Sequence, residues 1–213
     1  MTLTQTLSRL TAGIATLILA GCITLLPDTQ PAQLYRFTPD PGALPAVSAA
    51  GTARTALIRA GGSFHPAAAG DRILTAEGAE AAYLANARWT QSASVLFDQA
   101  LVAAFAASPG NARLIMPGEL GRPIFGLRVD VSRFEADYDQ GSRAAPEVRI
   151  DLHVVVTRLR DQKVVQEQSF SVRRRASENR GGAIAEAFRE AAAEALGSIV
   201  RTADEGVAAG PAA

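Results

Sequence analysis

The single cysteine of the chain, Cys22, directly follows Leu19, Ala20 and Gly21. This order matches the lipobox that lipoprotein signal peptidase cleaves, in which small residues let the backbone enter the peptidase and the cysteine thiol accepts a diacylglycerol group. Cys22 has no second cysteine with which to form a disulfide. A buried structural thiol is the alternative, but the loop-like LPDTQPAQ that follows disfavours it. The pattern predicts that Cys22 is lipidated.

The residues before Cys22 have the features of a secretory signal peptide. Arg9 precedes an uncharged run from Leu10 to Ala20, as in a basic n-region followed by an apolar h-region. A membrane-spanning helix needs about 20 apolar residues, roughly twice the length of this run. We therefore expect residues 1–21 to be removed and the acyl chains on Cys22 to anchor the mature protein. Ile23 stands where an aspartate often retains lipoproteins at the inner membrane, which favours the outer membrane.

The composition fits one neutral globular domain on a tether. The chain has 21 basic and 21 acidic residues, so it has no strong field to attract nucleic acid. About 190 residues remain after the signal, which is enough for one domain with its own core. We expect a tether with the lipidated Cys22 over 22–32, a single domain over 33–205 and a disordered tail over 206–213.

The remaining polar residues do not form a recognisable catalytic or metal motif. His65 and His153 are far apart and lack the spacing of a zinc site, so no metal and no cofactor is expected. Glu135, Asp137 and Asp139 could be an acid and base pair or a cation site, but a solvated hairpin end is the simpler interpretation. No nucleophile elbow, phosphate loop or dinucleotide motif is present. We therefore predict a protein that is not an enzyme.

One dense basic run stands out, formed by Arg173, Arg174 and Arg175. It could contact lipid phosphates or an acidic partner surface. The alternative is a solvated strand end, which is the more common meaning of such a run. Gly181 and Gly182 precede a helix and offer backbone amides to an anion, although two glycines are a weak signal.

Hydrophobic periodicity predicts strands and two helices. The segment EVRIDLHVVVTRL alternates apolar and polar residues, as a half-buried strand does. GLRVDVSRFEADY alternates until the phase shifts at Phe134, which indicates a bulge or bend. Apolar residues recur at helical spacing after Ser92, which is a candidate N-cap, and again after Gly182. Shorter strands are expected over 33–38, 54–59, 72–76, 79–85 and 113–116, and a further strand in VVQEQSFSVRRRA should complete a long hairpin.

This order of elements predicts an α+β fold. We expect a mainly antiparallel sheet of about six to eight strands, with two long helices packed on one face. The opposite face of the sheet would carry the polar residues. Trp89 and Tyr83 are expected to pack in the core under the first helix, or alternatively to lie at an interface.

Several segments together resemble the ABC-type transport auxiliary lipoprotein family, whose members accompany MCE-domain lipid transport systems of the Pqi type. They are the lipobox, the early strand QLYRF, Arg88 and Trp89 leading into a helix, the strand LRVDVSRFEAD before a long hairpin, and the final alanine-rich helix. The resemblance covers nearly all of the mature chain. The loop from Pro39 to Ala53 and the absence of a proline at Thr90 to Ser94 depart from the family pattern.

The resemblance implies a non-enzymatic component of an envelope lipid transporter. Its partners would be an MCE-domain protein with an ABC permease and ATPase, which the lipoprotein would dock at the outer membrane from the periplasmic side. A homo-oligomeric ring of several copies is one arrangement that this role allows. Two alternatives stay open: a stand-alone periplasmic lipoprotein that binds phospholipid, and an outer-membrane assembly factor.

Overall fold

The computed structural model describes residues 31–37, 54–116, 119 and 121–210. The chain divides into two compact units, Met1–Pro31 and Ala32–Ala213, and the second contains all the strands and helices described below. The predicted signal peptide and Cys22 lie outside the described residues. Among the helices of the described part, none has both the length and the apolar character needed to cross a membrane.

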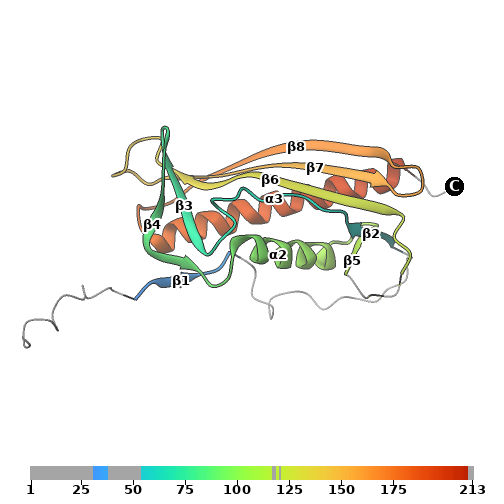
Figure 1. The fold of residues 1–213 in the computed structure, drawn as a ribbon, viewed down its shortest axis with the longest axis horizontal. Helices are drawn as coiled ribbons and strands as arrows, with labels where there is room; N and C mark the ends of the chain where they lie inside the picture. The colour runs from blue at the N-terminus through green and yellow to red at the C-terminus, as the bar shows by residue number, and fades with distance from the viewer. Residues whose placement is uncertain (1–30, 38–53, 117–118, 120, 211–213) are drawn as a thin grey trace, which may run out of the picture. The chain divides into compact units, whose positions relative to one another are not determined.

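The described residues form eight strands and two helices (Figure 1). In chain order they are β1 (Gln33–Tyr35), β2 (Thr55–Arg59), β3 (Arg72–Glu77), β4 (Glu80–Trp89), α2 (Ala93–Ala107), β5 (Ala112–Ile115), β6 (Phe125–Asp137), β7 (Glu147–Arg158), β8 (Lys163–Arg175) and α3 (Gly181–Ala209).

The long strands β6, β7 and β8 pair antiparallel and form the body of the sheet. The predicted alternation of β7 is confirmed, because every second residue from Val148 to Val156 is buried. The predicted irregularity in β6 is also confirmed, since the register with β7 shifts between Val131 and Arg133. This bulge keeps Phe134 in the core although its spacing from Val131 breaks the period of two.

The sheet is mixed, so the prediction of a mainly antiparallel sheet is wrong. Within the described residues four of the seven strand pairings are parallel: β1 with β4, β2 with β5, β2 with β6, and β3 with β6. Both β2 and β3 lie along the same edge of β6. Between them, the His65 N–H donates to the Val131 carbonyl and the Val131 N–H donates to the Ser63 carbonyl. The chain from β2 to β3 therefore runs alongside β6, parallel to it, as one interrupted strand.

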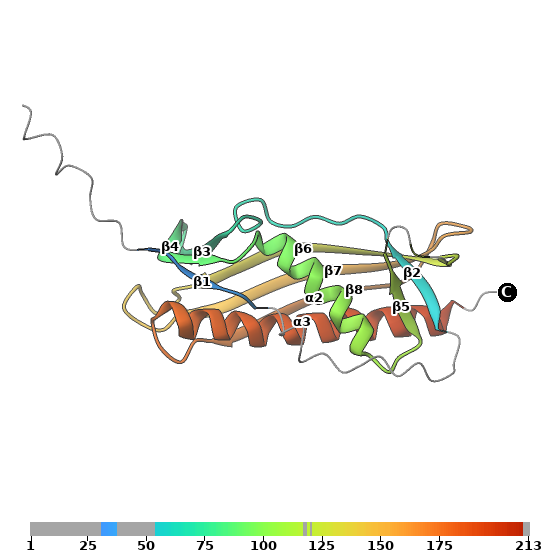
Figure 2. The ribbon, with the colours of Figure 1, turned by 90° about the horizontal axis from the view of Figure 1, so that it is seen from below.

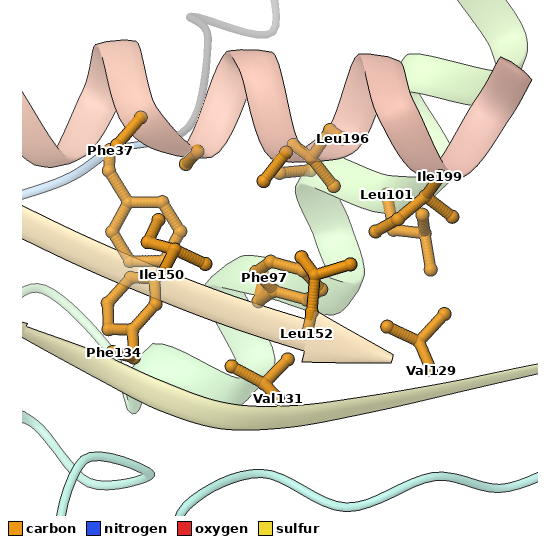
Figure 3. Close-up of a cluster of buried hydrophobic side chains, with 14 of the residues drawn as sticks. Phe37, Phe97, Leu101, Val129, Val131, Phe134, Ile150, Leu152, Leu196 and Ile199 are labelled. Atoms are coloured by element: carbon orange, nitrogen blue, oxygen red, sulfur yellow. The ribbon is translucent and has the colours of Figure 1, made fainter. Parts of the chain in front are cut away.

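Both helices cover the same face of the sheet, as predicted (Figure 2). The apolar stripe expected for α3 is buried along its length, at Ile184, Phe188, Ala192, Ala195 and Ile199. Figure 3 shows how Leu196 and Ile199 of α3 lie above side chains from the sheet and beside those of α2. The core thus lies between one helical layer and one sheet layer.

The last helix is longer than the sequence pattern indicated. It continues to Ala209, and Gly206 and Val207 are buried, so residues 206–209 are helical rather than part of a disordered tail. A Cβ at Gly206 would lie 3.0 Å from the Val156 side chain. The small residue therefore lets the end of α3 approach β7 closely, a contact that local hydropathy does not reveal.

Aromatic side chains from four parts of the chain meet near the start of α3. Phe37, Trp89, Phe134 and Phe188 are each at most 2% exposed, and we call them the aromatic cluster. The ring centroids lie 4.9 Å apart for Phe134 and Phe188, and 5.0 Å apart for Phe37 and Trp89. Trp89 is thus a core residue, which was the expected default.

Candidate functional site

The face of the sheet opposite the helices carries a layer of charged side chains, which we call the open face. It is formed by the outward residues of β6, β7 and β8. Most of its charges are paired: Arg149 lies 2.9 Å from Asp137, Arg128 lies 2.7 Å from Asp130, and Arg175 lies 2.8 Å from Asp139. Because most cations have an acid beside them, the face presents alternating charge and little net field.

The carboxylates at the end of β6 act as partners of arginines. Glu135 lies 3.3 Å from Arg133, while Asp137 and Asp139 pair with Arg149 and Arg175. The hydrogen bonds from Arg175 lower the pKa of Asp139 below its usual value. All three acids are therefore engaged in ion pairs with arginines, in agreement with the solvated hairpin end that the sequence analysis preferred to an acid and base pair.

The arginine run does not form one patch, because neighbouring strand residues point to opposite faces. Arg174 lies on the helix side and pairs with Glu194 of α3. Arg175 lies on the open face, bound to Asp139 and Glu147. Arg173, also on the open face, stands opposite Arg149 and makes no ion pair with another described residue. Of the three predicted contact residues, Arg173 is thus the one whose charge is available to a partner.

Sequence reasoning missed a polar row that crosses β7 and β8. The His153 ring lies between two residues of β8, with Nδ1 3.0 Å from Ser169 Oγ and Nε2 3.0 Å from Glu167 Oε1. A hollow of about 350 Å³ borders the row, and Asp151 Oδ1 is buried beside it without a hydrogen-bond partner. The sequence could have revealed this row only if the register of the β7–β8 hairpin were known, because that register places His153 opposite Ser169.

The serine, histidine and glutamate stand in the order of a catalytic triad, but their surroundings differ from those of a hydrolase. The side chains of His153 and Glu167 are 39% and 57% exposed, so water competes for the bonds that would orient the imidazole. A triad also requires donors aimed at a developing oxyanion, and besides His153 itself the described lining of the hollow offers only serine hydroxyls for this role. The row is better suited to polar contact than to nucleophilic attack.

The second histidine lies on the other side of β6 from His153. His65 belongs to the segment that follows β6, and its ring Nδ1 is buried without a partner in the described part of the chain. No group of three or more His, Cys, Asp or Glu residues that could hold a metal occurs among the described residues.

Gly181 and Gly182 are the first two residues of α3 rather than residues before it, and Gly181 has a packing role. A Cβ at Gly181 would lie 2.9 Å from the Tyr35 hydroxyl oxygen, so a side chain there would push against β1. Glycine at this position lets the start of α3 approach the first strand. This contact explains why a glycine stands at position 181, and an anion-binding role is not needed to explain it.

These observations define a class of protein: an α+β domain with helices on one face of a mixed sheet and an open face of paired charges suited to contact. Two solved structures share the fold. The protein XCC0632 from Xanthomonas campestris, assigned to the DUF330 family model, is 26% identical; the match covers 79% of this chain and 92% of that one, with a TM-score of 0.61. A second crystal structure, of an uncharacterized protein, is 14% identical and has the same TM-score, covering 81% of this chain and 98% of that one.

The family model of the ABC-type transport auxiliary lipoprotein component matches residues 44–200, and the chain belongs to this family. No curated protein sequence matches the chain. Membership makes the chain a lipoprotein of the cell envelope that faces the periplasm, a component of a transporter and not a member of a known enzyme family.

Proposed function

We propose that this protein is the lipid-anchored, non-enzymatic component that docks an MCE-associated ABC-type lipid transporter at the outer membrane. The observation that carries the proposal is the family match over residues 44–200. The lipobox at Cys22 supplies the anchor, and a diacyl or triacyl cysteine holds a protein on a membrane for long periods. The partners are an MCE-domain protein with its permease and ATPase.

The outer edge of β8 is the surface that best fits docking. Among the described strands β8 pairs with β7 alone, so its 13 residues present a long unpaired edge. The edge strands β1 and β5, by contrast, have three and four residues. An exposed edge of this length readily accepts another strand.

Charge is arranged along this edge so that pairing is selective. Lys163 and the arginine run mark its two ends, whereas the stretch from Gln166 to Val172 contains a single charge, Glu167. Charged side chains at a sheet edge discourage unspecific pairing. A partner strand with a carboxylate near Arg173 would satisfy both the backbone edge and the unpaired guanidinium.

The test is affinity purification from crosslinked membranes, with the acylated protein tagged at its C-terminus. We expect an MCE protein to be recovered with its permease and ATPase. Arg173→Glu should reduce this recovery, and Arg143→Glu is the matched control, because Arg143 is an exposed arginine in the loop between β6 and β7. Recovery of none of the three proteins with intact lipoprotein would refute the transporter role. Recovery of copies of the lipoprotein alone would assign the β8 edge to self-association instead.

A further inference from the structure

An apolar groove lies on the helical side of the molecule, away from the open face. One wall is the outer side of α2, where Val95, Gln99 and Val102 recur at helical spacing, and the other is the end of β5 with Leu114, Ile115 and Met116. Its volume is about 500 Å³, which is within the range of small-ligand sites. Val95 and Met116 are 42% and 43% exposed, so apolar surface faces water here.

The charged groups of the groove are close together. Arg59, at the end of β2, and Asp98, on α2, both line it, and Arg59 Nη2 lies 3.3 Å from Asp98 Oδ1. The next residue, Gln99, is the remaining polar group of the lining. The groove thus has an apolar body and a polar portion, which is the distribution found in an amphiphile.

Arg59 is incompletely satisfied by its surroundings. Its Nη1 is buried and finds no acceptor among the described residues. Burial lowers the pKa of Arg59, and the acids Asp98 and Asp130 offset that shift in part. The Asp98 side chain is 61% exposed, so water can solvate this carboxylate when the guanidinium turns to another anion. A buried donor without an acceptor is costly, and an anionic oxygen is the acceptor that a guanidinium binds most strongly.

We propose that this groove binds a single acyl chain that ends in an anionic headgroup, with the chain between α2 and β5 and the carboxylate or phosphate at Arg59. An acyl chain has no polar groups along its length, which suits walls in which Gln99 is the one described polar side chain besides the Arg59 and Asp98 pair. An extended peptide would bring backbone N–H and C=O groups that these side chains leave unpaired. The site goes beyond the docking role, because it gives the domain a ligand of its own.

The groove differs from the cavity that lipid binding between helices and sheet would require. The core between those layers is closely packed, with Phe97, Leu127 and Ile199 each at most 1% exposed. The groove borders this core at Leu101 and Leu114 and opens to the surface. A chain could therefore enter and leave without separation of the helices from the sheet.

The experiment uses the mature acylated protein in vesicles of phosphatidylethanolamine and phosphatidylglycerol that contain a trace of photoactivatable lipid. Three probes share one diazirine-bearing chain: palmitate, phosphatidylglycerol and hexadecanol. Mass spectrometry then locates the labelled peptides. We expect palmitate or phosphatidylglycerol to label residues of α2 and β5, and the more effective probe identifies the headgroup as carboxylate or phosphate.

Two sets of variants test the walls and the polar portion separately. The double variant Val95→Gln, Met116→Gln should lower labelling by roughly fivefold to tenfold, since it removes apolar contact with the chain. Val164→Gln is the matched control, because Val164 is a similarly exposed valine on β8. Arg59→Gln should reduce labelling by the anionic probes to the level of hexadecanol, whereas Arg59→Lys should retain most of it.

Equal labelling of the parent protein and the Val95→Gln, Met116→Gln variant would overturn the site. Label confined to other segments would do the same and would leave an amphipathic helix of a partner protein as the occupant of the groove. Circular dichroism of each variant establishes that the fold is intact. Because transporter recovery is measured without lipid probes, failure of this proposal and failure of the docking role are separable.

Discussion

The aromatic cluster and the groove lie on the same side of one sheet but differ in how completely side chains fill them. In the cluster, rings from β4, β6, α3 and the segment after β1 interlock, and Trp89 and Phe188 lie 5.2 Å apart. At the groove, α2 and β5 contribute aliphatic side chains that leave about 500 Å³ open. Filled space contributes stability and open space permits binding, so the two regions should respond differently to truncation.

Truncation of the cluster should have the largest effect. Trp89→Ala removes a buried side chain that contacts Phe37, Phe134 and Phe188, and we expect a loss of about 3–5 kcal/mol in the free energy of unfolding. Val95→Ala at the groove should change it by less than about 0.5 kcal/mol. Urea unfolding of both variants measures this difference. Similar losses would mean that the groove is part of the core and that the contrast is wrong.

The segment between the two regions can be tested with neighbouring glycines. Gly62 has φ +128°, and a Cβ there would lie 2.1 Å from the Val129 carbonyl oxygen, whereas Gly61 has φ +90° and open space around it. Both alanine variants are strained by the positive φ. Gly62→Ala should cost about 1–3 kcal/mol more than Gly61→Ala, because the segment must also move away from β6. Equal unfolding midpoints would show that this segment shifts freely.

An effect of similar size is expected where Arg54 ties α2 to β5. Its guanidinium donates to the carbonyl oxygens of Phe105, Gly110 and Ala112 at 3.0, 3.0 and 2.6 Å. Arg54→Ala should lower the free energy of unfolding by about 1.5–3 kcal/mol, because partly buried carbonyls lose a charged donor. Arg173→Ala is the control and should change it by less than about 0.5 kcal/mol. If Arg54→Ala changed the free energy of unfolding as little as the control does, the hydrogen bonds of Arg54 would not be what holds α2 and β5 together.

The sequence predicted those parts of the fold that depend on local periodicity. Alternation located β7 and the bulge in β6, and helical spacing located α2 and α3. The parallel pairing of β2 and β3 with β6 was missed, because it joins segments about 60 to 70 residues apart through backbone hydrogen bonds. Such a pairing leaves no pattern of side-chain types in the sequence. Short strands that are neighbours in the sequence suggest only antiparallel hairpins.

The candidate sites were predictable to a smaller extent. Arg173 was found as part of a basic run, but strand pairing decides that Arg174 and Arg175 have acidic partners. The groove was not found, because Arg59, Val95 and Met116 are each ordinary in their local context. Only the tertiary fold brings a strand end, a helix face and a second strand together around a hollow.

The smallest expected effect concerns two exposed ion pairs at opposite ends of β7. Hydrogen bonds from Arg158 lower the pKa of Asp161 to about 2, and those from Arg175 lower the pKa of Asp139. A carboxyl whose pKa is depressed by folding stabilises the native state above its unfolded pKa. That contribution is lost as the pH falls through the folded pKa, here from about 4 to about 2 for Asp161.

Arg158→Gln should therefore raise the pKa of Asp161 towards its ordinary value and leave that of Asp139 unchanged, as measured by NMR titration of the carboxyl groups. The variant should also lose less stability than the parent between pH 4 and pH 2, because its Asp161 binds a proton almost equally well when folded and unfolded. Arg175→Gln should give the reciprocal result at Asp139. If one variant moved both pKa values, the open face would act as a single coupled network of charges rather than as separate pairs, and substitutions at Arg173 would then have to be interpreted against that network.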